Sequence, residues 1–258
     1  MQAFLIIVAV CYGLIIGSFL NAWAYRLANG EKITAGRSHC PKCGAQIRAY
    51  DNVPLVSWLL LRGRCRDCGA AISRRYPVGE ALTAVLFAAL AAYDGLSLLL
   101  IPHLLFVSVM LLVSQVDLEK RIIPDVVILS AAAIGVPLMI WLGPGPWWEW
   151  PLAGVGAAGF LFLISEAYYR LRHVEGMGFG DVKMALCMGV YLGVTVVPAL
   201  FLGFLSGAVI GVALIFLRKG DAKTAVPFGP FLAAGAIVAL FVGRFLIDAY
   251  LGLAFPDR

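Results

Sequence analysis

Charged residues are scarce in this sequence. Asp, Glu, Lys and Arg make up only 14% of the 258 residues, whereas a soluble domain carries about a quarter. Hydrophobic residues account for 62%, which leaves too little polar surface to cover a water-soluble globule. The scarcity of charge therefore excludes an ordinary soluble enzyme and predicts a chain that is mostly surrounded by lipid.

The hydrophobic segments also lack the period-two alternation of polar and apolar residues. Transmembrane β-strands alternate in this way because one face meets lipid and the other meets the lumen. A membrane-crossing helix instead needs roughly 20 consecutive apolar residues. We predict an all-α polytopic membrane protein with about eight transmembrane helices, near residues 3–25, 78–93, 96–116, 126–142, 150–167, 183–197, 199–217 and 231–250.

Basic residues are missing from three of the seven connections between these segments. None precedes the first apolar run, whereas basic residues follow it from Arg26 onward. If the N-terminus lies outside, the inside segments are 26–77, 117–125, 168–183 and 217–230. All but two of the 20 Lys and Arg residues, Arg244 and Arg258, then lie inside, as the positive-inside rule predicts. We therefore expect a multi-pass membrane protein, embedded in the lipid bilayer, with its N-terminus outside and a retained first helix.

The net charge of +5 is explained by this topology. Lys and Arg gather on the inside of membrane proteins without any nucleic-acid ligand. We therefore expect no nucleic-acid partner.

One long polar stretch, residues 26–77, interrupts the apolar sequence and contains four of the six cysteines. They form two pairs, Cys40-Pro-Lys-Cys43 and Cys65-Arg-Asp-Cys68, and a glycine follows each pair. Two such pairs can supply four thiolates to a tetrahedral Zn²⁺ site, and glycine permits the tight turns. Structural disulfides are the alternative, but disulfides are rare in the reducing cytosol that this segment is predicted to face.

We therefore predict a structural zinc site, because four thiolates leave no open coordination position. The predicted domains are 1–25, a first transmembrane helix; 26–77, a cytosolic zinc-binding insert; and 78–258, a transmembrane core. The other two cysteines, Cys11 and Cys187, lie in apolar segments and are expected to be small buried hydrophobic residues.

Two carboxylates lie where predicted membrane helices end. Asp117 closes the third apolar segment, and Asp181 opens the sixth. Ionisable groups in membrane helices are costly and often functional, although the cost is smaller near the interface. A helix N-cap is the alternative for Asp181 alone, and a solvated loop carboxylate, paired with Lys120 or Arg121, is the alternative for Asp117 alone. The spacing by itself leaves both alternatives open.

Structural roles explain the glycines and Asp125 near these aspartates, whereas no such role explains Glu80. Gly176, Gly178 and Gly180 let the backbone before Asp181 bend and approach a neighbour. Asp125 follows a proline that restricts the preceding residue, and we expect it to cap the fourth helix. Glu80, at the inner mouth of the second helix, is not readily explained as a solvated charge.

Taken together, these residues resemble the type IV prepilin peptidase family, whose members are GxGD-type aspartic peptidases and often also N-methyltransferases. The matching segments follow the family's order from the first helix to the last. They are Gly17-Ser-Phe-Leu-Asn21 with Arg26-Leu27, the two cysteine pairs, Asn52-Val-Pro54 with Ser57-Trp58, Arg75-Tyr-Pro77 through Glu80, Asp117 through Ile123-Pro124-Asp125, Gly176 through Lys183, and Pro227-Phe-Gly-Pro230.

The resemblance implies cleavage of the short basic leader of prepilins or pseudopilins, after a glycine and at the cytosolic face of the bacterial inner (cytoplasmic) membrane. It implies Asp117 and Asp181 as the catalytic pair. We assign supporting roles to Gly178, Gly180, Lys183, Asp125 and Glu80. The resemblance also implies N-methylation of the new N-terminus with S-adenosylmethionine. The sequence does not indicate where this molecule binds, because it has no strand–GxGxxG–helix unit.

Peptide hydrolysis by two carboxylates needs one ionised and one protonated group. The ionised aspartate takes a proton from the attacking water, and the protonated one polarises the scissile carbonyl and then protonates the leaving amine. One alternative function is another GxGD intramembrane protease, of the presenilin or signal-peptide-peptidase type, which the cysteine pairs fit less well. A second is a non-enzymatic transporter or scaffold with a zinc ribbon, which would keep its partner binding after Asp→Asn replacement.

Overall fold

In a computed structural model, the chain is described at residues 1–33, 36–174, 177–217 and 227–255. Within these ranges the backbone is helical, with two isolated β-bridges and no extended strand. The predicted all-α fold is confirmed. Gly176, Arg258 and most of the predicted inside segment 217–230 lie outside the described residues.

The long helices are apolar enough to cross a membrane. The described residues contain seven candidate spans, of which one, Phe179–Leu214, is a continuous stretch of 36 residues. That stretch comprises two helices, since Gly193 adopts a φ of +57° and a 3₁₀ turn separates α7 from α8. Large apolar side chains such as Leu163 and Phe216 are exposed, which suits contact with lipid. The protein is therefore a polytopic helical membrane protein.

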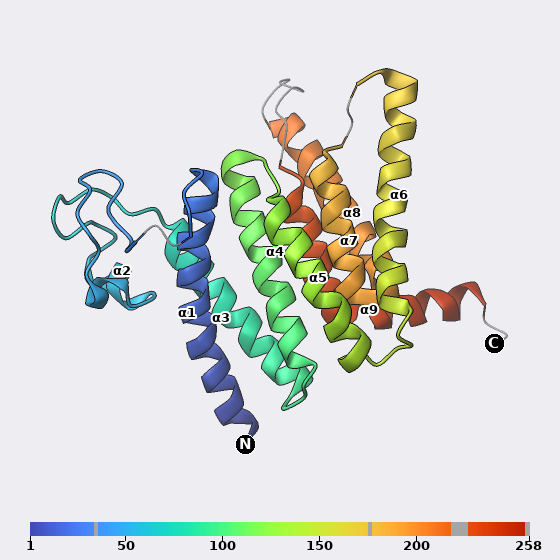
Figure 1. Ribbon diagram of the computed structural model, residues 1–258, viewed down its shortest axis with the longest axis horizontal. Helices are drawn as coiled ribbons and strands as arrows, with labels where there is room; N and C mark the ends of the chain where they lie inside the picture. Colours follow the sequence, from blue (N-terminus) through green and yellow to red (C-terminus); the bar gives the residue numbers. More distant parts are fainter. Residues whose placement is uncertain (34–35, 175–176, 218–226, 256–258) are drawn as a thin grey trace. The chain divides into compact units, whose positions relative to one another are not determined.

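The chain divides into two compact units, Met1–Gln115 and Val116–Arg258. Unit 1 contains α1 (Gln2–Ala28), η1 (Ala49–Asn52), α2 (Val56–Leu60), α3 (Arg75–Asp94) and the first part of α4 (Leu100–Lys120). Unit 2 contains the end of α4, α5 (Asp125–Leu142), α6 (Glu149–Arg172), α7 (Phe179–Leu192), η2 (Gly193–Thr195), α8 (Val196–Leu217) and α9 (Gly229–Ala254). Figure 1 labels the helices.

In unit 1, α1 and α3 pack closely through glycine. A Cβ at Gly13 would lie 2.6 Å from the Cα of Ala84, and one at Gly17 would lie 2.8 Å from the Cα of Glu80. Glycines four residues apart let two membrane helices bring their backbones together. Cys11, by contrast, is exposed, so the prediction that it is buried is wrong: it lies on a part of α1 that α3 does not cover.

In unit 2, α7 forms the core. Ten of its 14 residues are buried, including Cys187, as predicted for that cysteine. It packs against α5, α6 and α9. Gly189 of α7 approaches the backbone of Ala153 and Gly154 in α6, and the hydroxyl of Tyr191 donates a hydrogen bond of 2.9 Å to the carbonyl of Ala131 in α5. These contacts fix the position of the helix that carries Asp181.

Candidate active site and metal centre

Asp117 is a buried side chain of α4. It is 5% exposed, and its Oδ2 accepts a hydrogen bond of 2.9 Å from the backbone N–H of Gly229, the first residue of α9. A Cβ at position 229 would lie only 2.8 Å from the same oxygen. Asp117 is therefore not a solvated loop carboxylate, and the contact requires glycine at position 229.

Asp181 lies in the first turn of α7 and is 8% exposed. The helix begins at Phe179, four residues before the predicted segment, because Gly178 takes the extended conformation of an N-cap residue. The N–H of Asp181 donates to the carbonyl of Gly178 at 3.0 Å. Asp181 itself is therefore not the N-cap, which removes the alternative considered from sequence.

The carboxyl groups of Asp117 and Asp181 lie near enough for the charge of one to act on the other. Within the described residues, neither carboxylate forms an ion pair. Gly180 lies against Ile123, with a Cβ at position 180 only 2.9 Å from the Ile123 side chain. This close approach brings the start of α7 to the connection between α4 and α5, so the two buried aspartates share one end of unit 2.

Asp125 and Lys183 form an ion pair beside this site. Lys183 Nζ lies 2.7 Å from both carboxylate oxygens of Asp125 and 4.9 Å from the centre of the Phe179 ring. The N-cap of α5 is Pro124, without a side-chain capping bond. The expectation that Asp125 caps this helix is therefore wrong, because its carboxylate binds a cation on α7 instead.

The four cysteines of the insert gather into one cluster. Their Sγ atoms all lie within 4.8 Å of one another, and those of Cys40 and Cys68 are 3.9 Å apart. A tetrahedral Zn²⁺ with bonds of about 2.3 Å separates its sulfur ligands by roughly 3.8 Å. The donor set therefore fits a closed four-thiolate site. No disulfide forms, since all four cysteines are free.

The two knuckles repeat the same backbone pattern. The N–H of Cys40 donates to Ala45 and that of Cys65 donates to Ala70, each at 2.8 Å. Gly44 and Gly69 have φ values of +72° and +69°, a conformation that suits glycine. The backbone N–H groups of Cys43 and Lys42 lower the pKa of the Cys40 thiol to about 6, which favours the thiolate form that binds metal.

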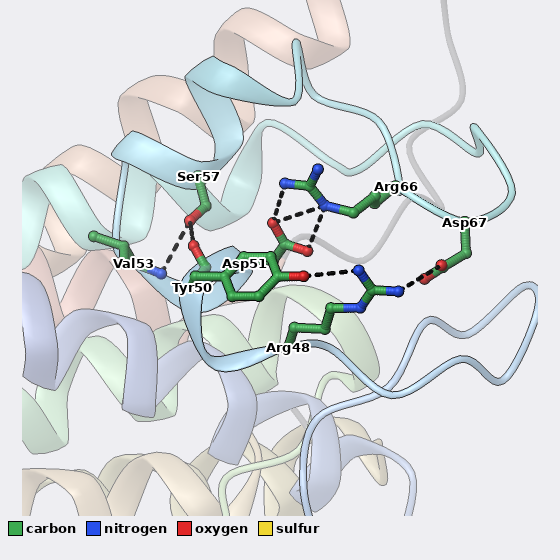
Figure 2. A network of polar contacts seen from close by, with 7 residues as sticks. All are labelled: Arg48, Tyr50, Asp51, Val53, Ser57, Arg66 and Asp67. Carbon is green, nitrogen blue, oxygen red and sulfur yellow. Dashed lines mark hydrogen bonds and ion pairs between the residues drawn. The ribbon is translucent and has the colours of Figure 1, made fainter.

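A polar network joins the second knuckle to the segment between the knuckles (Figure 2). Arg66 donates three side-chain hydrogen bonds to Asp51, with N–O distances of 2.6, 2.8 and 3.1 Å, and its guanidinium lowers the pKa of that carboxyl. Arg48 donates to the hydroxyl of Tyr50 at 2.7 Å and lies 3.9 Å from Asp67. Residues 66 and 67 stand between Cys65 and Cys68, so the network ties the metal-binding turn to η1.

The structure separates the sequence-predicted residues into two groups. Asp117, Asp181, Asp125, Lys183, Gly178 and Gly180 belong to unit 2, and Glu80 and the four cysteines belong to unit 1. The backbone N–H of Gly229 was not identified from sequence as a partner of Asp117. Pro230 at the first turn of a helix could have signalled the start of α9, but a backbone donor has no side-chain signature.

Seven candidate membrane spans within the described residues, a buried aspartate pair and a four-cysteine cluster define a polytopic membrane protein with the side chains of an aspartic peptidase. Residues 104–215 match the type IV leader peptidase family, and residues 11–93 match the bacterial peptidase A24 N-terminal domain. The chain belongs to the type IV leader peptidase family, which confirms the resemblance noted from sequence.

Several known proteins are similar over nearly the whole chain. A prepilin leader peptidase/N-methyltransferase of Bacillus subtilis (strain 168) is 35% identical, over 94% of this chain and 96% of its own length. Proteins of the same name from Aeromonas salmonicida (strain A449) and Pseudomonas aeruginosa are 36% and 32% identical, over 93% and 96% of this chain and 91% and 94% of their own lengths. No solved structure matches this chain significantly.

Proposed function

We propose that this protein is a membrane aspartic endopeptidase that removes the basic leader of type IV prepilins or pseudopilins after a glycine, and then N-methylates the new N-terminus. The observation that best supports peptidase activity is the pair of buried carboxylates, Asp117 and Asp181, at one end of unit 2. The names of the relatives support the substrate and the methylation. Full-length similarity supports both activities in one chain.

In this mechanism the two aspartates share one proton. The ionised carboxylate removes a proton from water as the water oxygen attacks the scissile carbonyl. The protonated carboxyl donates a hydrogen bond to that carbonyl and later protonates the departing amine. Because like charges held close do not both ionise readily, the pair titrates as a unit. The hydrogen bond from the Gly229 N–H holds one oxygen of Asp117 in place during these steps.

The inner membrane is the proposed location, with the aspartate pair facing the cytosol. Within unit 2, Lys120, Arg121, Arg170 and Arg172 lie at the same ends of their helices as this pair, whereas the turn at 143–149 has no Lys or Arg. In unit 1, the insert at 26–77 carries ten basic residues. Each unit by itself satisfies the positive-inside rule with these ends inside.

Zn²⁺ is the proposed metal, held by Cys40, Cys43, Cys65 and Cys68. Four thiolates close its coordination, so the metal would stabilise the insert, residues 26–77, and leave the peptide chemistry to the aspartates. The insert is too small and polar to supply a large core of its own. The zinc is therefore proposed as a structural element.

The peptidase is tested by incubating the purified full chain with a prepilin in detergent and separating precursor from product. Asp117→Asn and Asp181→Asn should each abolish cleavage, because Asn neither accepts nor donates the catalytic proton. Asp248→Asn is the matched control, because Asp248 forms an exposed ion pair with Arg244 on α9. This variant should cleave the prepilin at the wild-type rate. Asp125→Asn should be milder, within about tenfold, since an exposed ion pair contributes about 1 kcal/mol or less.

Cleavage by Asp117→Asn or by Asp181→Asn at the wild-type rate would refute this catalytic pair. A chain that is folded but inactive towards every prepilin and pseudopilin offered would refute the substrate class. A scaffold or transporter would keep its partner binding in all of these variants, which distinguishes it from the peptidase.

A further inference from the structure

Unit 1 contains a cavity of about 390 Å³ between the insert and the ends of α1 and α3. Ser18 and Tyr25 of α1, Trp58 of α2, and Tyr76 and Glu80 of α3 contribute to its walls. Small-molecule sites have volumes of about 300–1,000 Å³ and combine apolar or aromatic walls with a few placed polar groups. All of the lining residues belong to unit 1, and neither Asp117 nor Asp181 is among them.

Glu80 gives the cavity a buried carboxylate. The residue is 8% exposed; its Oε2 accepts a hydrogen bond of 2.8 Å from the N–H of Leu55, and the Ser18 side chain lies near the carboxyl group. Both of these groups are neutral, and among the described residues Glu80 forms no ion pair. A carboxylate removed from water is stabilised by a compensating positive charge. The lining also includes Arg26, Lys42 and Arg66, so the cavity suits a ligand that carries both a cationic and an anionic group.

One wall of the cavity is a strained turn at Leu55, whose N–H donates a hydrogen bond to Glu80. Leu55 has φ 59° and ψ −49°, and the N–H of Val56 donates to the carbonyl of Pro54 at 2.6 Å. These values describe a γ-turn of the rare, strained type. Strained backbone persists only where its surroundings fix it, and it gathers at ligand sites. Glu80 therefore fixes the shape of the cavity as well as its charge.

Trp58 provides a rigid aromatic wall. A Cβ at Gly63 would lie 2.8 Å from the indole, and the indole N–H donates to the carbonyl of Ile72 at 3.4 Å. These contacts hold the ring in place before any ligand binds. Aromatic faces attract both planar heterocycles and cations, so the cavity joins an aromatic wall to a negative charge.

We propose that this cavity binds S-adenosylmethionine, with Glu80 facing the positive charge of the ligand and Trp58 contacting its adenine. The proposal rests on the N-methylation proposed above. When bound, S-adenosylmethionine supplies a methyl group that bonds to the lone pair of the new N-terminal amine, while the carbon–sulfur electron pair leaves with sulfur and the amine releases one proton to water. The carboxylate, the aromatic wall and the volume all fit a ligand with a sulfonium, an ammonium and a planar base.

The test measures binding rather than turnover. Calorimetry on the purified full chain should show that wild type binds S-adenosylmethionine and that Glu80→Gln binds it at least about tenfold more weakly, as expected for the loss of one charged contact. Gln keeps an oxygen acceptor for the Leu55 N–H. The affinity for S-adenosylhomocysteine, which lacks the sulfonium charge, should fall less between wild type and Glu80→Gln. Glu166→Gln is the matched control, since Glu166 pairs with Arg170 on the exposed face of α6.

A second measurement does not depend on how the variant folds. An adenine-azide analogue of S-adenosylmethionine, cross-linked to wild type by light, should attach within residues 18–80; attachment within residues 116–258 overturns the proposal. The proposal is also overturned if wild type does not bind S-adenosylmethionine, or if Glu80→Gln binds this molecule as tightly as wild type. Displacement of S-adenosylmethionine from the cavity by a basic leader peptide would overturn the proposal as well. Prepilin cleavage, scored in parallel, separates these outcomes from failure of the peptidase assignment.

Discussion

At the scale of single residues, the backbone of α9 positions the proposed catalytic carboxylate. The N–H of Gly229 binds Oδ2 of Asp117, and this donor is available because the first N–H groups of a helix have no partner within it. A hydrogen bond from a fixed backbone group holds a side chain more firmly than contact with another mobile side chain would. The geometry of the pair therefore depends on a residue that has no side chain.

Replacing Gly229 with alanine should disable the peptidase without unfolding the protein. The new Cβ would lie 2.8 Å from Asp117 Oδ2, so the carboxylate must move. Displacement of a catalytic group by about 1 Å can lower the rate about 100-fold. The initial rate of prepilin cleavage by purified Gly229→Ala measures this loss, with helical content checked by circular dichroism.

Gly252→Ala is the control for this change, since it lies on the same helix and a Cβ there meets nothing within 4 Å. It should cleave at the wild-type rate. Equal rates for Gly229→Ala and wild type would show that the contact with Asp117 has no part in catalysis.

At the scale of elements, the insert depends on turns rather than on a hydrophobic core. Its described regular structure is two short helices, η1 and α2, together with the paired β-bridges that frame the knuckles. The Arg66–Asp51 contact and the cluster of thiols join these pieces. A segment of this kind gains most of its folding free energy when a metal binds.

The purified protein should contain one zinc per chain, measured by elemental analysis after washing with a weak chelator. The double variant Cys40→Ser/Cys65→Ser removes one thiolate from each knuckle, so zinc should be lost and the insert should become sensitive to protease. Thermal stability should fall, whereas any cleavage activity of the protein that remains folded should be near normal, because the metal has no open position.

Cys11→Ser is the matched control for the zinc prediction, because this cysteine is exposed on α1 and lies outside the cluster. It should keep full zinc content. A metal-free wild type with two disulfides, shown by counting free thiols, would contradict the zinc assignment.

At the scale of the whole molecule, the placement of basic residues determines the orientation in the membrane, and contact with lipid explains the apolar surface. Within the described helices, large exposed apolar side chains cover the outward faces of both units, and in water such surfaces would aggregate. Basic residues gather at the helix ends next to the aspartate pair and throughout the insert. The apolar surface therefore indicates membrane insertion, and the placement of the basic residues predicts the sidedness.

Cysteines introduced one at a time into a Cys11→Ser background, with labelling scored against that background alone, should reveal this sidedness in intact spheroplasts. Pro144→Cys, in the turn between α5 and α6, should react with a membrane-impermeant maleimide from outside. Arg172→Cys, at the end of α6, should react only after the membrane is permeabilised. Both positions are exposed, so a lack of reaction reflects the membrane rather than burial. The reverse pattern would overturn the proposed topology.

Much of the fold was predictable because lipid imposes a simple rule on sequence. Long apolar runs must form helices, since the backbone has no water to bind within the bilayer, and the predicted all-α architecture is confirmed. Helix ends were less predictable. The helix α7 begins four residues early because Gly178 serves as its N-cap, a role that depends on backbone conformation. Cys11 was misassigned because hydropathy does not reveal which face of a helix meets a neighbour.

The sequence by itself determined the class of protein and the cysteine pattern, and it singled out the two aspartates as candidates, because composition, CxxC spacing and motif order are local properties of the chain. Asp117 and Asp181 stay predictions as catalytic residues. Tertiary structure alone decided which groups meet: that Gly229 donates to Asp117, that Asp125 pairs with Lys183 instead of capping α5, and that Glu80 faces a cavity. These contacts join residues up to 112 positions apart, and only the packing of the helices brings such distant groups within bonding distance.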